Sequence, residues 1–261
     1  MNLETPIPFI DIKSIQGIFF DFGYVIGYPV VGIDRKYFYL NWDGIDAILR
    51  DPAIKQCFRS NVGKVELVAF FERELYRVFR LHEEADLIDP QSNKILNDKL
   101  PQILDCPIDQ KLVDRLLFHL DTMKYIAIDP ASMKVIAELK HRGYCLALVS
   151  NMMLPGKLLR AKLQQANLLA YFDAVTISSD VGYIKPHPEI FRQALDQCHL
   201  HADQVVFLGD TYKQDILGAK RVGMKTIWLN SRQESDALAL DDPPDATLKN
   251  ISDLVSSLVS G

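Results

Sequence analysis

The sequence predicts an α/β protein built on a doubly wound parallel sheet, with a smaller all-α domain inserted near its start. Two observations support this prediction. After residue 125, short apolar segments alternate with segments of helical length, which is the rhythm of a parallel sheet with crossover helices. Residues 33–119 instead show helical periodicity without a clear strand. We therefore expect a discontinuous core domain of residues 1–29 and 125–261 and a helical domain of residues 30–124.

The first strand is expected at 17–22, because its continuous run of Ile and Phe is typical of strands buried on both faces. Residues 1–16 before it form a polar lead-in. The glycines and proline of 27–32 after it suit a turn or a hinge. In the inserted region, apolar residues at helical spacing predict helices at 43–50, 64–80 and 108–120.

The second half of the chain predicts four more strands and the helices between them. The strands are expected at 144–149, 174–177, 204–208 and 225–229. The helices are expected at 131–141, 156–165, 188–197 and 213–222. A turn-rich stretch at 241–245 then leads to a short helix at 251–259.

Composition narrows the class of protein. With 48% hydrophobic and 24% charged residues, the chain resembles an ordinary globular protein, and its net charge of −5 argues against a nucleic-acid partner. The N-terminus lacks the pattern of a signal peptide, and no uncharged run reaches the ~18 residues of a membrane span. The cysteines, which form no CxxC pair, are expected to be reduced core residues. We expect a cytoplasmic protein, monomeric or homodimeric, without a membrane partner.

Three predicted strands end in polar residues, namely Asp21, Ser150-Asn151 and Gly209-Asp210. If these strands are adjacent and parallel, the polar groups converge at one end of the sheet, where open α/β sheets form their crevice. Asp21 and Asp210 would repel each other there unless a cation lay between them. Hard oxygen ligands with room for water suit Mg²⁺.

Two further charged residues are candidates for the same crevice. Asp215 follows Asp210 by five residues and could join the metal ligands directly or through water. Lys185 lies between the strand at 174–177 and the next helix, within reach of the crevice. A metal, a lysine, a hydroxyl and an acidic nucleophile in one crevice indicate phosphoryl transfer.

These residues resemble the four ordered motifs of the haloacid dehalogenase-like (HAD) superfamily. The resemblance implies that Asp21 is the nucleophile that becomes phosphorylated. It implies that Ser150 and the neighbouring backbone at Asn151 hold the phosphoryl oxygens. Lys185 would restrain the nucleophile and neutralise charge, and Asp210 would hold Mg²⁺. The helical insertion is similar to the α-helical cap domain of one subgroup, and the rest of the chain would be the Rossmann-like core.

One position departs from the family pattern. Phosphatases of this family usually carry a second Asp two residues after the nucleophile as general acid and base, and here that position is Gly23. The backbone carbonyl of Gly23 can still be a metal ligand. A positioned acid contributes about 10²–10⁴ in rate, so its loss need not abolish turnover. Tyr24 is a possible substitute donor, although packing of its ring beside the site is the favoured interpretation.

Three functions remain open from the sequence. The favoured one is a Mg²⁺-dependent phosphatase that hydrolyses a small phosphorylated metabolite through an aspartyl-phosphate, with a sugar phosphate, phosphoglycolate or a nucleotide as possible substrates. A dehalogenase-type hydrolase would also lack the second Asp, but it needs no metal, so Asp210 and Asp215 argue against it. A weakly active regulatory or binding protein is the third possibility, and the complete motif set argues against it.

Overall fold

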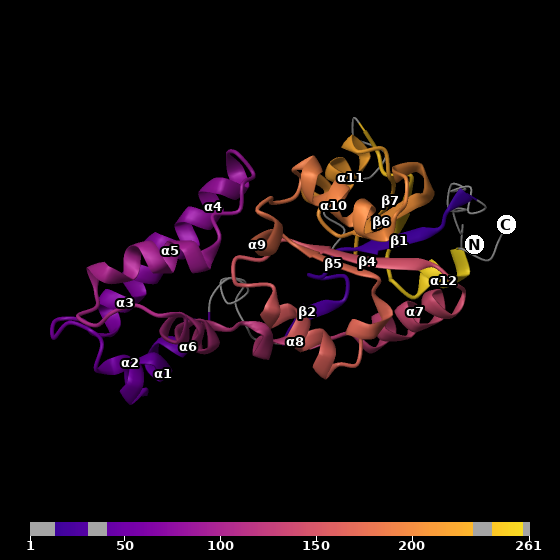
Figure 1. Ribbon diagram of the computed structural model, residues 1–261. Helices are drawn as coiled ribbons and strands as arrows, with labels where there is room; N and C mark the ends of the chain where they lie inside the picture. Colours follow the sequence, from indigo (N-terminus) through magenta and orange to yellow (C-terminus); the bar gives the residue numbers. More distant parts are fainter. Residues whose placement is uncertain (1–13, 31–40, 232–241, 258–261) are drawn as a thin grey trace.

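The central element of the structure is a parallel sheet of six strands (Figure 1). The structure is a computed structural model that describes residues 14–30, 41–231 and 242–257. The strand order is β5–β4–β1–β6–β7–β8, with all neighbours parallel. The strands are β1 (Gly17–Phe20), β4 (Cys145–Ser150), β5 (Ala174–Ile177), β6 (Val205–Gly209), β7 (Lys225–Leu229) and β8 (Ala246–Leu248). The predicted fold class is confirmed.

Helices cover both faces of the sheet, so the sheet is doubly wound (Figure 1). In β1, the alternating side chains Ile18 and Phe20 pack into one hydrophobic cluster, and Phe19 packs into another on the opposite face. The first cluster includes side chains of α7 (Pro130–His141), α8 (Lys157–Gln165) and α12 (Asp253–Ser257). The second includes side chains of α10 (Pro188–Cys198) and α11 (Leu217–Arg221). Short helices η6 (Leu169–Tyr171), α9 (Ser178–Val181) and η7 (Ala202–Gln204) complete this part.

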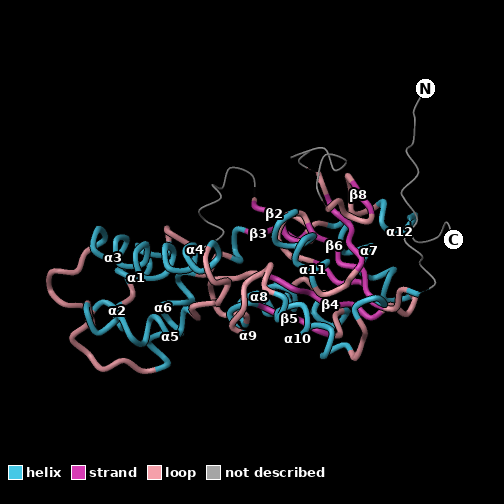
Figure 2. Tube along the Cα trace, turned by 90° about the horizontal axis from the view of Figure 1, so that it is seen from above, coloured by secondary structure: helices cyan, strands magenta, loops and turns pink. Residues whose placement is uncertain are grey.

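The inserted region is helical where it is described, and it lies at one end of the molecule, beyond the carboxyl ends of the strands (Figures 1 and 2). Its elements are α1 (Gly44–Arg50), α2 (Pro52–Lys55), α3 (Lys64–Phe71), η3 (Glu72–Tyr76), α4 (Arg77–Glu84), α5 (Ser92–Lys99), η4 (Leu100–Gln102) and α6 (Gln110–Leu120). α6 shows why these segments are helical. The Asp109 side chain caps it by accepting a hydrogen bond from the Leu112 amide at 2.8 Å, and Leu112, Leu116 and Leu120 bury one face. We propose that the helical region is a cap domain separate from the core.

Three differences from the sequence predictions stand out. Gly27–Pro29 is not part of a loop but forms β2, which pairs antiparallel with β3 (Ile126–Ile128). The two connections to the helical region are therefore tied together by backbone hydrogen bonds. The helix expected at 64–80 contains the π-helical turn η3. The short elements α2, α5, α9 and β8 were not predicted, because three to eight residues carry too little periodicity. Parts of several predicted segments lie outside the described residues, namely 1–13, 31–40, 241 and 258–259.

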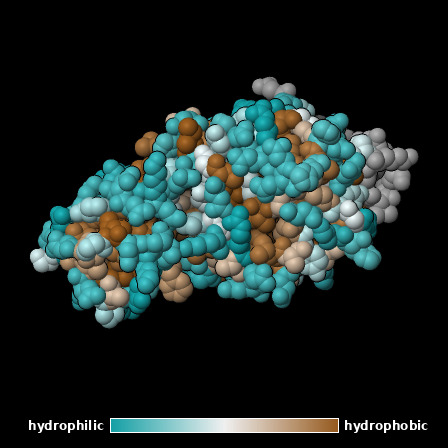
Figure 3. All heavy atoms as spheres, in the orientation of Figure 1, coloured by the Kyte–Doolittle hydropathy of each residue, from teal (hydrophilic) through white to brown (hydrophobic). Residues whose placement is uncertain are grey.

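The surface is mixed in character. The face drawn in Figure 3 is mostly hydrophilic, with small apolar patches. Among the described residues, none of the helices combines the length and the apolar character that crossing a membrane requires. All four cysteines are free thiols, and they are half-buried rather than part of the core.

The helical region is also hydrogen-bonded directly to the core through a short strap, residues 87–89. The Asp89 amide donates to the Gly182 carbonyl at 2.9 Å, and the Ile184 amide donates to the Leu87 carbonyl at 2.7 Å. Leu87 has a φ of 61°, in the left-handed region that a leucine rarely adopts. Since Ile184 immediately precedes Lys185, the strap helps to fix the backbone on which that lysine stands.

Asp89→Asn is expected to stabilise the protein at neutral pH. Asp89 is 4% exposed, and burial raises its pKa to about 6 from the ordinary value of 3.8. Because the folded-state pKa is raised, its stabilising contribution is full below the unfolded value and is lost as the pH rises through about 6. At neutral pH the ionised group therefore costs up to roughly 3 kcal/mol, which the neutral amide avoids.

Urea unfolding of the wild type and Asp89→Asn measures this effect at about pH 4.5 and about pH 7.5. The variant should gain stability relative to the wild type at the higher pH and gain little at the lower one. Asp98→Asn, which removes an exposed carboxylate from α5, is the control. An equal gain at both pH values would show that ionisation of Asp89 is not the cause.

Candidate active site

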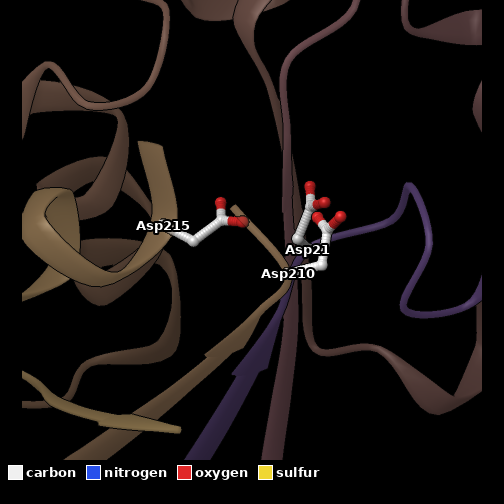
Figure 4. Close-up of side chains that lie close together, drawn as sticks. All are labelled: Asp21, Asp210 and Asp215. Carbon is white, nitrogen blue, oxygen red and sulfur yellow. The ribbon is translucent and has the colours of Figure 1, made fainter. Parts of the chain in front are cut away.

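Three buried carboxylates meet at the carboxyl end of the sheet. Asp21 follows β1 and Asp210 follows β6, and these strands are neighbours, so the two side chains stand next to each other (Figure 4). Asp215 reaches toward them from η8 (Tyr212–Ile216), the π-helical turn after β6. One oxygen of each carboxylate lies within 4.8 Å of the other two. The convergence expected from the strand ends is thus present.

Lys185 is the cation that holds this cluster together. Its Nζ lies 2.6 Å from Oδ1 of Asp21 and 2.7 Å from Oδ1 of Asp215, and its side chain is 2% exposed. Burial opposes the charged ammonium, but the two carboxylates outweigh burial and raise the pKa of Lys185. The lysine therefore stays charged and fixes the orientation of Asp21.

The cluster carries more negative than positive charge. Burial raises the pKa of Asp21 to about 6, with Asp215 adding to the rise and Lys185 opposing it. Three carboxylates facing one ammonium leave an excess of negative charge in a buried place, and oxygen donors of this kind suit Mg²⁺. The residues present therefore fit a divalent cation. Both oxygens of Asp215 already have partners, Lys185 and the Thr211 amide at 2.9 Å, which favours contact with a metal through water.

Two neighbours explain how Asp210 and Asp215 are positioned. A Cβ at Gly209 would lie 2.3 Å from the Cβ of Asp215, so only glycine allows Asp215 to fold back over the end of β6. The indole Nε1 of the buried Trp228 donates to the Asp210 carbonyl at 2.8 Å. Steric crowding by Asp215 thus explains why glycine precedes Asp210 in the sequence motif. The hydrogen bond from Trp228 holds the backbone carbonyl of Asp210 in place.

Ser150 is the last residue of β4 and Asn151 follows it, next to the end of β1 that Asp21 follows. The Asn151 side chain is committed to the backbone of Lys185, since its Oδ1 accepts from the Lys185 amide at 2.7 Å and its Nδ2 donates to the Lys185 carbonyl at 3.1 Å. Asn151 therefore positions the lysine, and any contact with a phosphoryl group falls to its backbone. Ser150 is buried and lines the same cavity as Asp21.

Gly23 and Tyr24 lie in the tight loop after Asp21. A Cβ at Gly23 would meet only Oδ2 of Asp21, at 3.9 Å, so the position has room for a side chain. Tyr24 has a φ of 56°, and its ring packs edge-on against Tyr28 with the centroids 6.1 Å apart. Its ring thus has the packing role favoured from the sequence, and it also lines the cavity.

Asp21 and Asp210 line a cavity of about 390 Å³ between the sheet and the helical region. α4 contributes Phe79, Arg80 and Glu83 to its lining, and η8 contributes Gln214. These residues were not identified from the sequence, because nothing in the periodicity of α4 distinguishes the face that points at the sheet. The helical region therefore borders the site directly.

The sheet is parallel, and a buried lysine–carboxylate cluster at its carboxyl end opens into a cavity beneath a helical region. This arrangement is that of an α/β enzyme. More particularly, the chain belongs to the haloacid dehalogenase-like hydrolase family, whose model matches residues 64–229.

Individual relatives share the fold and part of the sequence. A glyceraldehyde 3-phosphate phosphatase from Pyrococcus abyssi is 33% identical over 135 residues, which is 50% of this chain and 55% of that protein. The chain thus spans about half the length of this relative. An HAD phosphatase from Thermococcus onnurineus has a TM-score of 0.57 at 24% identity, covering 94% of this chain and 98% of the other. A 2-haloacid dehalogenase from Pseudomonas syringae has a TM-score of 0.63 at 22% identity with the same coverages.

Proposed function

We propose that this protein is a Mg²⁺-dependent phosphatase that hydrolyses a small phosphomonoester through an aspartyl-phosphate on Asp21. The observation that carries the proposal is the contact of Lys185 with Asp21 and Asp215 beside Asp210. It provides an oriented carboxylate nucleophile together with oxygen ligands for a metal. The name of the Pyrococcus abyssi relative, a phosphatase of a three-carbon sugar phosphate, supports the same chemistry.

In this mechanism, Lys185 holds Asp21 so that one carboxylate oxygen faces the phosphorus of the ester. That oxygen forms a bond to phosphorus as the bond to the leaving oxygen breaks, and water then attacks phosphorus and frees Asp21. Ser150 and the Asn151 backbone orient the phosphoryl oxygens. Asp21, the Gly23 carbonyl and Asp210 would hold Mg²⁺, with Asp215 acting through water. When bound, the metal supplies positive charge beside the transferred phosphoryl group.

The helical region would act as the cap of this enzyme. α4 lines the cavity that holds Asp21, so closure over a bound ester would exclude water and limit the size of the leaving group. The paired strands β2 and β3 would be the hinge, because they join the two parts.

Turnover of phosphate esters is expected to require Mg²⁺, and a screen of phosphorylated metabolites with Mg²⁺ or with a chelator tests the proposal. 2-Chloropropionate is included as a substrate for dehalogenation. Phosphate release that disappears on chelation and returns with added Mg²⁺ is the expected result, because the excess negative charge of the cluster would otherwise repel the ester. Full phosphatase activity in the chelator would rule out the metal site. Release of chloride without phosphatase activity would identify a dehalogenase.

Gly23→Asp is expected to accelerate hydrolysis of simple alkyl phosphates. Alkoxides are poor leaving groups that depend strongly on protonation, and the site has room for a side chain at this position. A carboxylic acid placed there could restore proton transfer and raise kcat/KM by about a hundredfold for such esters. Esters of more acidic alcohols should gain less.

The matched control is Gly23→Asn, which has the same shape without an ionisable proton. The measurement is kcat/KM across esters graded by the pKa of the leaving alcohol. A flat dependence in the wild type, with the chemical step rate-limiting, would mean that another residue already serves as the acid.

A further inference from the structure

The cavity beyond the reactive groups has mostly apolar walls. The apolar side chains include Phe79, Met123, Ile126, Met152, Met153 and Leu159. They come from α4, the short helix η5 (Met123–Tyr125), β3, the loop after β4, and α8, so both the core and the helical region contribute. Three of the six methionines of the chain are among them. Methionine side chains adapt to the shape of an apolar ligand and make favourable contacts with aromatic rings.

The polar groups on these walls are largely bonded to one another. Glu83 forms an ion pair with Arg80 and accepts a hydrogen bond from Nε2 of Gln214 at 2.8 Å. The Asn151 amide is bonded to the Lys185 backbone. A leaving group with many hydroxyls, such as a sugar, would therefore find few partners, and each buried hydroxyl left unpaired weakens binding by about tenfold.

The glycine at position 23 gives a separate argument about the leaving group. With no carboxylic acid two residues beyond the nucleophile, esters whose leaving oxygen is stable as an anion are favoured. Phenols meet this condition better than alkyl alcohols. The apolar wall favours an aromatic leaving group through packing, and the missing acid favours it because a phenolate is a stable anion. Both features therefore favour a phosphate ester of a phenol.

We propose that the cavity takes a small phosphate ester of an aromatic alcohol, with the ring against the methionine-rich wall. The inference rests on the proposed phosphatase function. In the reaction, the bond from phosphorus to the ring oxygen breaks as the bond from Asp21 forms, and the phenolate leaves and takes a proton from solvent. A volume of about 390 Å³ holds a single ring with small substituents. A free aryl phosphate and the side chain of phosphotyrosine both meet this condition, and a separate test distinguishes them.

The first test compares kcat/KM for phenyl phosphate, acetyl phosphate and glucose 6-phosphate with Mg²⁺ present. Acetate is a better leaving group than phenolate but has no ring. Phenyl phosphate should nevertheless exceed acetyl phosphate by about tenfold, because burying the ring stabilises its transition state. If acetyl phosphate or glucose 6-phosphate is the better substrate, the ring subsite is wrong while the phosphatase function stands. If no phosphate ester is turned over, the proposed function fails and the subsite with it.

A phosphotyrosine peptide distinguishes the two sources of a phenolic phosphate. Slower turnover of the peptide than of phenyl phosphate supports the small-molecule assignment, and faster turnover overturns it.

The second test uses Met123→Gln, which keeps the length of the side chain but adds a polar amide to the wall. Its KM for phenyl phosphate should rise about fivefold, and the ratio of kcat/KM for phenyl to acetyl phosphate should shrink accordingly. Met133→Gln, on α7 and outside the cavity lining, is the matched control and should change neither value. An unchanged ratio in a folded Met123→Gln protein would contradict the placement of the ring.

Discussion

Asp21→Asn is expected to abolish turnover while leaving the fold intact. The amide cannot attack phosphorus, so kcat should fall by a factor of about 10⁴ or more, the scale of losing a covalent nucleophile. Stability should hold, because burial already disfavours the charge of Asp21, as its raised pKa indicates, and Lys185 keeps Asp215 as a partner. Steady-state kinetics and thermal unfolding of the same preparation separate the two effects.

The wild type should also carry a phosphoryl group on Asp21 during turnover. Rapid acid quenching followed by mass spectrometry of peptides would locate it on the segment that contains Asp21. Asp203→Asn, which changes an exposed carboxylate outside the cavity, is the control and should keep full activity. An Asp21→Asn enzyme with near wild-type kcat would end the covalent mechanism.

Lys185→Met is expected to reduce both stability and activity. The substitution leaves Asp21 and Asp215 as buried carboxylates without their cation, and breaking a buried ion pair in this way costs about 3–5 kcal/mol. Turnover should fall as well, because Asp21 loses the contact that orients it. Urea unfolding at neutral pH measures the first effect, and kcat measures the second.

A second substitution shows whether the loss of stability in Lys185→Met comes from unbalanced charge or from lost packing. Adding Asp215→Asn to Lys185→Met removes one of the stranded charges while keeping an acceptor for the Thr211 amide. The double variant should regain part of the lost stability and remain poorly active, because Asp21 still lacks its partner. A double variant less stable than Lys185→Met would show that packing of the lysine stem, rather than its charge, dominates.

Most of the sheet could be predicted from the sequence because its strands are buried on both faces. A short continuous apolar run such as the one at 17–22 is typical of a strand buried on both faces. The alternation of such runs with helical segments indicates that the strands pair in parallel. The positions of Asp21, Asn151 and Asp210 follow from the same logic, since each lies at or within two residues of the end of a predicted strand and parallel strands end at one edge. β2 was missed because three residues with a glycine and a proline indicate a turn, and only pairing with β3, about 100 residues later, makes them a strand.

The class of fold and the groups at the edge of the sheet could be predicted from the amino-acid sequence, because apolar patterns and strand ends depend on consecutive residues. The tertiary structure alone decided that Asn151 holds the Lys185 backbone and that Trp228 holds the Asp210 carbonyl. It also decided that one face of α4 borders the cavity beside Asp21. These contacts join residues far apart in the chain, and their partners follow from packing in three dimensions rather than from any local pattern.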